Sequence, residues 1–277
     1  MLKALILGML QGAAEFLPVS SSGHLVLVPW LLGWESPGLA FDAVVHWGTA
    51  LAVVVYYWRD WVEIVRSVLN SMRIQSIRRQ GLLMDGQARL GWLIILGAIP
   101  AAVLGYFLDD FFERLFDQPA AAAGFLLITA LLLVASERLG RPSRNVAEMN
   151  WLDALVVGIA QALAIFPGVS RSGATIAAGL TRGLQRDLAA RYSFLLGTPV
   201  ILGAGLFKVV GLAQAGSLAA DWPSLLVGFV VSGVVGFGSI HLLLSYVRER
   251  RLYPFAAYCA AFGVFCLVVV LVRGGAA

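Results

Sequence analysis

The chain has 277 residues, of which 60% are hydrophobic and only 13% are charged, and its mean hydropathy is +0.85. Soluble domains carry about 25% charged residues, so this composition excludes an ordinary soluble protein and indicates an integral membrane protein. The net charge of +4 reports sidedness in such a protein, and nothing in its distribution supports nucleic acid binding. No removable signal peptide is expected, because no apolar tract ends in an A-x-A cleavage site.

Six tracts are long and apolar enough to cross a membrane, which takes roughly 20 residues: 41–58, 91–108, 120–136, 192–212, 223–247 and 254–272. Two more apolar regions, about 2–33 and 151–180, are too long for one crossing and too short for two. Each is interrupted near its middle, by "FLPVSSSGH" and "FPGVSRSG", and proline ends a helix because it lacks the N–H donor. We therefore expect two re-entrant helical hairpins.

The charged residues predict which connections face the cytoplasm. The connection from 59 to 89 holds six arginines against three acidic residues, and the segment from 137 to 150 holds three arginines. These two segments, the basic stretch 181–191 and "RERR" at 248–251 are expected inside. "DDFFERLFDQP" and "AQAGSLAADWP" carry one and no basic residue and are expected outside. The first hairpin then enters from outside and the second from the cytoplasm.

An internal repeat relates the two interrupted regions. Shifting the sequence by 150 residues lays "GMLQGAAEFLPVSSSG" over "GIAQALAIFPGVSRSG", with eight identities in sixteen positions. We expect a single integral membrane domain over 1–277, made of repeat 1 (1–136) and repeat 2 (151–272), each with one hairpin and three crossings. Because three is odd, the second repeat would be inverted. The predicted fold is an all-α polytopic membrane protein with an inverted-topology repeat, in which broken helices line a polar site.

Polar residues gather at the two breaks. An ionisable group at membrane depth is costly, so Glu15, His24 and Arg171 are expected to face a cavity or one another. Gln11 and Glu15 lie four residues apart on one helix face. The second short helix of each hairpin starts with glycine and serine, and such an N-terminus binds anions, while the guanidinium of Arg171 suits phosphate. Two such breaks from opposite sides would clamp a diphosphate.

Each feature alone also has a structural explanation. On that explanation proline and glycine would serve packing and the serines would cap helices. Glu15 would form an ion pair with Arg171, and His24 would be a hydrogen-bonded core residue. The combination of acid, imidazole, hydroxyls and arginine in two related breaks favours a functional site over a purely structural role. His46, His241, Asp42 and Lys208 lack such company and are not expected to do chemistry. The two cysteines, Cys259 and Cys266, share one helical face and are expected to pack rather than form a disulfide.

These residues carry a resemblance. "EFLPVSSSGH" with "FPGVSRSGATI" resembles the two signature motifs of the bacterial undecaprenyl-diphosphate phosphatase family, also called bacitracin-resistance proteins. "FDAVVHWGTALAVVVYYWR", "GAIPAAVLGYF" and "YSFLLGTPVILGAG" resemble further family segments in the same order. The resemblance implies hydrolysis of the C55 lipid diphosphate to the monophosphate carrier of cell-wall assembly. It also implies a divalent cation, Mg²⁺ or Ca²⁺, and a site in the inner membrane that opens to the periplasmic face.

The resemblance also assigns residues. The family's acidic motif falls on Gln11 and Glu15, which are the implied metal ligands, and its histidine falls on His24. Many members have glutamate in place of Gln11, so Glu15 must carry more of that role. The predicted catalytic residues are Ser21, His24, Glu15 and Arg171. The predicted phosphate-binding residues are Ser20, Ser22, Gly23, Ser170, Ser172, Gly173 and Thr175.

The predicted chemistry is in-line phosphoryl transfer. Ser21 attacks the terminal phosphorus, His24 accepts the proton, and Arg171 stabilises the charge on the equatorial oxygens. Water then hydrolyses the phosphoserine. Glu15 either holds the cation or orients His24, and the sequence leaves both roles open, together with Ser20 as nucleophile or direct attack by water.

A rival hypothesis comes from another class of protein. Inverted repeats with re-entrant hairpins also build secondary transporters, so the chain would instead move or flip a polyprenyl phosphate. A carrier, however, needs binding groups but has no need of a hydroxyl beside an imidazole. The partners expected in either case are the lipid substrate and membrane lipids. The oligomeric state stays open, a homodimer included.

The charge distribution makes a direct topological prediction. Both termini should lie outside, and the 59–89 and 137–150 connections should lie inside. Single cysteines introduced at the termini should react with a membrane-impermeant reagent added to intact cells, whereas a cysteine at position 75 should react only after permeabilisation. Labelling of position 75 from outside would overturn this topology.

Overall fold

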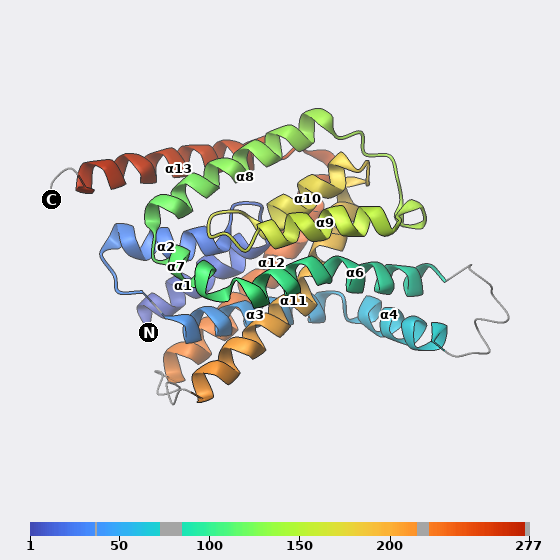
Figure 1. The fold of residues 1–277 in the computed structure, drawn as a ribbon, viewed down its shortest axis with the longest axis horizontal. Coiled ribbons are helices and arrows are strands. Elements are labelled where there is room, and N and C mark those ends of the chain that lie inside the picture. The colour runs from blue at the N-terminus through green and yellow to red at the C-terminus, as the bar shows by residue number, and fades with distance from the viewer. Residues whose placement is uncertain (37, 73–84, 215–221, 275–277) are drawn as a thin grey trace.

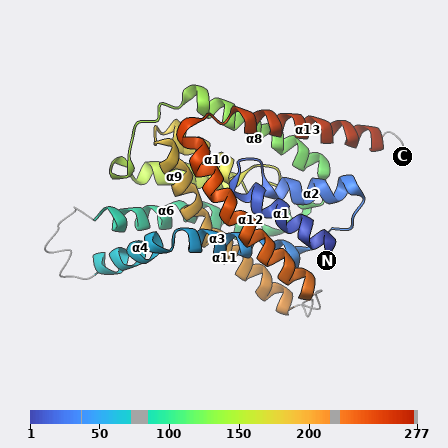
Figure 2. The same ribbon diagram turned by 180° about the vertical axis from the view of Figure 1, so that it is seen from behind.

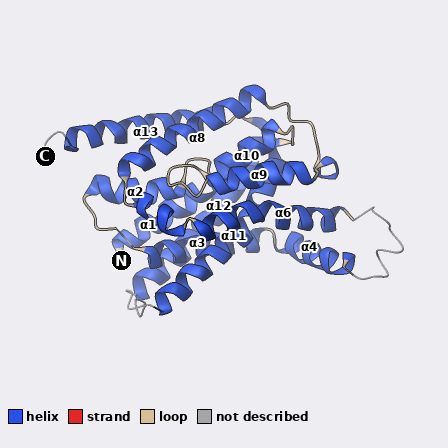
Figure 3. Cartoon of the chain, viewed as in Figure 1, coloured by secondary structure: helices blue, strands red, loops and turns tan. Residues whose placement is uncertain are grey.

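The computed structural model describes residues 1–36, 38–72, 85–214 and 222–274, and the secondary structure in these ranges is helical (Figure 3). Six helices are long and apolar enough to cross a membrane: α3 (Leu39–Tyr56), α6 (Gly86–Phe107), α8 (Pro119–Leu139), α11 (Arg186–Gln214), α12 (Trp222–Glu249) and α13 (Tyr253–Gly274). They overlap the six predicted tracts, so the prediction of an all-α polytopic membrane protein is confirmed. Most of the predicted outer stretch "AQAGSLAADWP" and position 75 of the predicted inner connection lie outside the described residues.

Both interrupted regions form pairs of short helices. The first hairpin consists of α1 (Leu2–Phe16) and α2 (Ser21–Leu32), and the second consists of α9 (Trp151–Leu163) and α10 (Arg171–Thr181). The remaining elements are α4 (Trp58–Ser71), α7 (Asp109–Phe116) and the short 3₁₀ helix η1 (Val146–Glu148). None of these is among the candidate spans. The four hairpin helices end or begin at the two interruptions, which lie inside the bundle.

The breaks within the two hairpins have matching local chemistry. We call residues 17–20 the first break and residues 164–170 the second break. Ser20 ends the first, and its Oγ accepts a hydrogen bond from Gly23 N at 3.2 Å. Ser170 ends the second, and its Oγ accepts from Gly173 N at 3.0 Å. Each serine is thus the N-cap of the following helix, satisfying one of the donors that a helix start leaves without an intrahelical acceptor.

Glycines bring each hairpin close to a crossing of the other half of the chain. α1 packs along α12, as Figure 2 shows, and α9 packs along α6. A Cβ on Gly12 of α1 would lie 2.7 Å from Ser232 O, and a Cβ on Gly158 of α9 would lie 2.3 Å from Gly97 O. Small residues allow such backbone approach in membrane bundles. Each hairpin thus packs on a helix of the other half of the chain, as an inverted repeat would have it. The inverted relation of the two halves itself stays a prediction.

The ends of the helices group as the charges predict. In Figure 1 the start of α1, helix α7 and the end of α13 lie toward the left, where the predicted outer segments belong. Helix α4, the start of α6 and the start of α9 lie toward the right, with the predicted cytoplasmic segments. Helices α8 and α13 lie side by side along the top of the bundle. The two predicted groups of segments thus lie at opposite ends of the bundle, and which end faces the cytoplasm stays a prediction.

An ion cluster fixes the second hairpin at its basic end. The carboxylate of Asp153 accepts from Arg144 Nη1 at 3.0 Å and Nη2 at 2.7 Å, and from Arg182 Nε at 2.7 Å. It also accepts from Asn150 N at 2.9 Å, which completes a capping box at the start of α9. Asp153 is fully buried. One carboxylate thus joins α9 to the segments that precede it and to the end of α10.

We expect Asp153→Asn to destabilise the protein by about 3 kcal/mol, because it removes the shared counter-charge of two partly buried arginines. The measurement is thermal or denaturant unfolding of the purified protein in detergent. The matched control is Asp187→Asn, an exposed carboxylate on α11 whose Oδ1 accepts from the neighbouring Leu188 N. Equal stability of the two variants would show that the cluster contributes no net stability.

Candidate active site

The two breaks meet inside the bundle. A Cβ on Gly23 would lie 3.0 Å from Gly168 Cα, so the backbones are in direct contact. Ser22 Oγ accepts from Gly168 N at 3.4 Å, and Ser172 Oγ donates to Leu17 O at 3.2 Å. The starts of α2 and α10 therefore lie next to each other, and the positive ends of two helix dipoles converge on one region.

Glu15 lies at the centre of this region. Its Oε1 accepts from Arg171 Nη2 at 2.9 Å and from Nε at 3.2 Å. Its Oε2 accepts from Ser21 Oγ at 2.6 Å and from Gln11 Nε2 at 2.9 Å. Glu15 is 4% exposed, so the carboxylate is held by hydrogen bonds on both oxygens. The structure thus brings together three of the four predicted catalytic residues, two from the first hairpin and one from the second.

A cavity of about 550 Å³ opens onto these groups. Glu15, Ser21, Ser22 and Arg171 contribute to its wall, and so does Lys208 of α11. Lys208 Nζ donates to the Asp109 carboxylate at 2.8 Å and also to Glu113, both on α7. Most of the remaining wall is apolar, with alanine, valine, leucine and phenylalanine side chains from α3, α6 and α11. The cavity therefore combines a charged interior with apolar sides.

Sequence reasoning missed His46, which lies beside Glu15, and Asp42, which lines the same cavity. His46 Nε2 lies 3.6 Å from Glu15 Oε2, and His46 Nδ1 lies 2.7 Å from Asp42 O. Both His46 and Asp42 line the cavity, as does Lys208, although none of the three was expected near the chemistry. A signal was present, because two ionisable residues four apart in an apolar span face one side of a helix and mark a polar pathway.

The structure does not bring His24 to Ser21. His24 Nδ1 lies 2.7 Å from Ser20 O, and its Nε2 lies 2.7 Å from the hydroxyl of Tyr258 on α13. The imidazole is 2% exposed and stacks on Phe262, with ring centroids 4.9 Å apart. Both ring nitrogens are therefore bonded to groups other than the predicted nucleophile.

Most predicted phosphate-binding residues take part in contacts within the hairpins. Of that set, Ser22 alone is among the residues described as lining the cavity. Ser20 and Ser170 are the N-caps, Gly23 and Gly173 donate to them, and Ser172 reaches the first break. Thr175 Oγ1 donates to Arg171 O at 2.7 Å and lies 2.6 Å from Ser193 Oγ. These residues fix the geometry of Ser21 and Arg171, and their predicted contact with phosphate stays a prediction.

The predicted metal ligands do not form an open cation site. Both oxygens of Glu15 already accept hydrogen bonds, and the positive guanidinium of Arg171 lies against Oε1. Gln11 presents its Nε2 to Glu15, while its buried Oε1 has no described partner. Within the described residues, no three His, Cys, Asp or Glu groups are placed to hold a metal ion. The donor set therefore does not fit a cation held by Glu15 and Gln11, and dependence on Mg²⁺ or Ca²⁺ stays a prediction.

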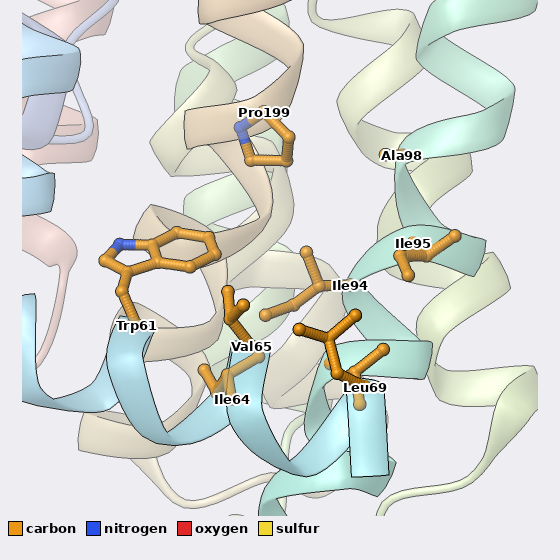
Figure 4. Close-up of a pocket in the computed structure, with 10 residues that line it drawn as sticks. Trp61, Ile64, Val65, Leu69, Ile94, Ile95, Ala98 and Pro199 are labelled. Carbon is orange, nitrogen blue, oxygen red and sulfur yellow. The ribbon is translucent and has the colours of Figure 1, made fainter. Parts of the chain in front are cut away.

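A second hollow, of about 420 Å³, lies between α4 and α6 (Figure 4). Figure 4 shows Ile64, Val65 and Leu69 of α4 opposite Ile94 and Ile95 of α6. None of the described residues lining it is ionisable, so it has no group for phosphoryl transfer. It shares two wall residues, Ala98 and Pro199, with the larger cavity.

The chain matches a known family over most of its length. The family described as bacitracin resistance protein BacA matches residues 4–265. A protein named undecaprenyl-diphosphatase from Methanosphaera stadtmanae is 43% identical over 275 residues, with 98% of each chain covered. Proteins of the same name from Desulforudis audaxviator and Moorella thermoacetica are 42% and 41% identical, again with 98% of each chain covered.

Proposed function

Because this chain belongs to the bacitracin resistance protein BacA family, we propose that it is an undecaprenyl-diphosphate phosphatase. It hydrolyses undecaprenyl diphosphate to undecaprenyl phosphate and inorganic phosphate, which recycles the lipid carrier of cell-wall synthesis and confers bacitracin resistance. The observation that carries the proposal is the Ser21 hydroxyl 2.6 Å from the Glu15 carboxylate, beside the Arg171 guanidinium. A hydroxyl, a proton acceptor and a phosphate-binding cation are the groups that this reaction needs.

The lining of the cavity fits an amphiphilic substrate. Its charged interior at Arg171 and Ser21 suits a diphosphate, and its apolar sides suit the first isoprene units of a lipid. The six candidate spans support a multi-pass membrane protein. We place it in the bacterial inner membrane with the cavity open to the periplasmic face, because the cavity wall includes α7, which lies in a predicted outer segment.

The first step is attack by Ser21 on the terminal phosphorus. The new bond forms between Ser21 Oγ and phosphorus while the bond from phosphorus to the bridging oxygen breaks, and undecaprenyl phosphate leaves. The hydroxyl proton passes to Glu15 Oε2, which already accepts the hydrogen bond from Ser21. An adjacent base is what makes a serine hydroxyl a competent nucleophile. The hydrogen-bond geometry favours Glu15 over His24 for this role.

Arg171 stabilises the charge that gathers on the phosphoryl oxygens. Three hydrogen bonds to Glu15 and to Ser193 O use three of its N–H groups, and a guanidinium has five. Two donors are left for phosphate oxygens, and the starts of α2 and α10 add favourable dipoles. The departing undecaprenyl phosphate takes the proton from Glu15, which returns the carboxylate to its ionised form. In the second step water attacks the phosphoserine and gives a proton to Glu15, and Glu15 passes this proton to Ser21 Oγ as the bond between phosphorus and Oγ breaks. Inorganic phosphate is released.

The alternative is a transporter or flippase of polyprenyl phosphate. Two helical hairpins whose breaks meet inside the bundle suit a transporter as well. The Ser21 to Glu15 bond favours an enzyme, because a binding site for transport needs no activated hydroxyl. Release of inorganic phosphate from polyprenyl diphosphate by the purified protein in detergent micelles, where transport is impossible, decides between the two.

Ser21→Ala should abolish phosphate release while the protein still binds the lipid diphosphate. We expect a fall in kcat of at least about 10³-fold, because the covalent route is lost. Ser20→Ala is the matched control: it removes the N-cap hydrogen bond, worth about 1 kcal/mol, and should retain measurable turnover. If Ser21→Ala still releases phosphate while Ser20→Ala does not, the nucleophile is Ser20. If both stay active, water attacks directly.

Arg171→Lys should keep the positive charge but lose the planar guanidinium that contacts Glu15 through two nitrogens. We expect kcat to fall by about 10² or more, with the unfolding temperature within a few degrees of the original. Phosphate release and thermal unfolding in detergent measure the two quantities. Near-native turnover in this variant would remove Arg171 from the mechanism.

A further inference from the structure

His24 is fully enclosed by contacts that explain its orientation. Its ring lies against α13, with ring centroids 5.6 Å from Tyr258 and 4.9 Å from Phe262 and with interplanar angles of 6° and 18°. One nitrogen bonds to Ser20 O and the other to the Tyr258 hydroxyl, both at 2.7 Å. A histidine packed against two aromatic rings and bonded at both nitrogens has little freedom to turn toward another group.

The hydrogen-bond partners fix the tautomer. A carbonyl oxygen can only accept, so Nδ1 must carry the proton that is donated to Ser20 O. In the neutral ring Nε2 is then an acceptor, and the Tyr258 hydroxyl donates to it. The result is a directional chain from Tyr258 through His24 to Ser20. Its end point is the residue immediately before Ser21.

Ser20 is the place where such support is needed. Its φ is +70°, and among the described residues it is the non-glycine residue with positive φ. An L-residue in that region costs on the order of 1–3 kcal/mol and persists only where its surroundings impose it. The carbonyl of Ser20 accepts from His24 Nδ1 and also from His24 N at 3.2 Å. These two bonds hold the peptide that leads into Ser21.

Helix α13 touches the first break at a second point. Cys259, next to Tyr258, donates from Sγ to Pro18 O at 3.6 Å, and Cys259 is fully buried. α13 thus contacts the first break directly at Pro18 and is linked to Ser20 through His24. It does so without lining the cavity, since Tyr258 and Cys259 are not among the cavity wall residues.

We propose that Tyr258 and His24 are positioning residues, which hold the Ser20 backbone in its left-handed conformation and thereby aim the Ser21 hydroxyl at Glu15. The proposal rests on the proposed function for its kinetic consequences, although the hydrogen-bond chain can be tested without activity. It gives α13 a part in catalysis at a distance from the reacting atoms. It also explains why His24 is buried beside the site although it has no role in proton transfer.

The kinetic test compares two substitutions at His24. His24→Asn places an amide nitrogen where Nδ1 was and keeps the bond to Ser20 O, whereas His24→Ala loses it. We expect kcat of His24→Asn to lie within about tenfold of the wild type, and kcat of His24→Ala to fall by at least about 100-fold. A general base would be lost in both variants, with equal falls of about 10²–10⁴. Equal, large losses would therefore overturn the positioning role.

The partner on α13 is tested by Tyr258→Phe, which keeps the stacked ring and removes the hydroxyl. We expect kcat to fall about fivefold, the effect of one hydrogen bond, with KM changed less than twofold, because the attack and not the binding is affected. The control is Tyr253→Phe on the same helix, five residues away and hence about 140° around it. A KM effect in place of a kcat effect, or equal behaviour of the two variants, would contradict the proposal.

A structural measurement separates this proposal from the proposed function. Hydrogen–deuterium exchange of peptides spanning 17–24 should be about fivefold faster in Tyr258→Phe than in the wild type, and unchanged in Tyr253→Phe. This result would support the hydrogen-bond chain even if the wild-type protein released no phosphate, an outcome that would refute the enzyme assignment alone. Unchanged exchange in Tyr258→Phe would overturn the hydrogen-bond chain itself.

Discussion

The ion pair between Glu15 and Arg171 is the contact on which the site depends. It joins the end of α1 to the start of α10, two elements 156 residues apart in sequence. Neither charge could be buried alone at this depth, because an unpaired ion in a low-dielectric interior costs several kcal/mol. The pair therefore requires both hairpins to be in place. Arg171 occupies Oε1 of the carboxylate, and Oε2 accepts the hydrogen bond from Ser21 Oγ at 2.6 Å, which fixes the direction of the nucleophile.

Sequence reasoning captured the features that follow from local chemistry. The breaks at Pro18 and Pro167 follow from the missing N–H of proline, and the caps at Ser20 and Ser170 follow from the needs of a helix start. The six spans follow from length and hydropathy. The encounter of Glu15 with Arg171 was also foreseeable, because charges at membrane depth must find partners.

The features that escaped prediction depend on how separate helices pack. His24 and Ser21 are three residues apart on one helix, so sequence spacing alone made a base and nucleophile pair plausible. The actual orientation of His24 is set by Tyr258, which lies 234 residues away. His46 was dismissed because its segment lacks the combination of acid, hydroxyls and arginine that marks the two breaks, yet α3 brings it within 3.6 Å of Glu15. Nothing in the local sequence of α3 specifies that approach.

The two sequence-related hairpins are not chemically equal. Gln161 occupies the place of Gln11, but the position corresponding to Glu15 is Ile165, and both amide atoms of the buried Gln161 side chain are without a described partner. The first hairpin supplies the carboxylate and hydroxyl, and the second supplies the guanidinium. One reaction centre is therefore assembled from two hairpins of unlike chemistry. Neither hairpin alone holds the hydroxyl, its proton acceptor and the phosphate-binding cation, so the site exists only where both hairpins are folded together.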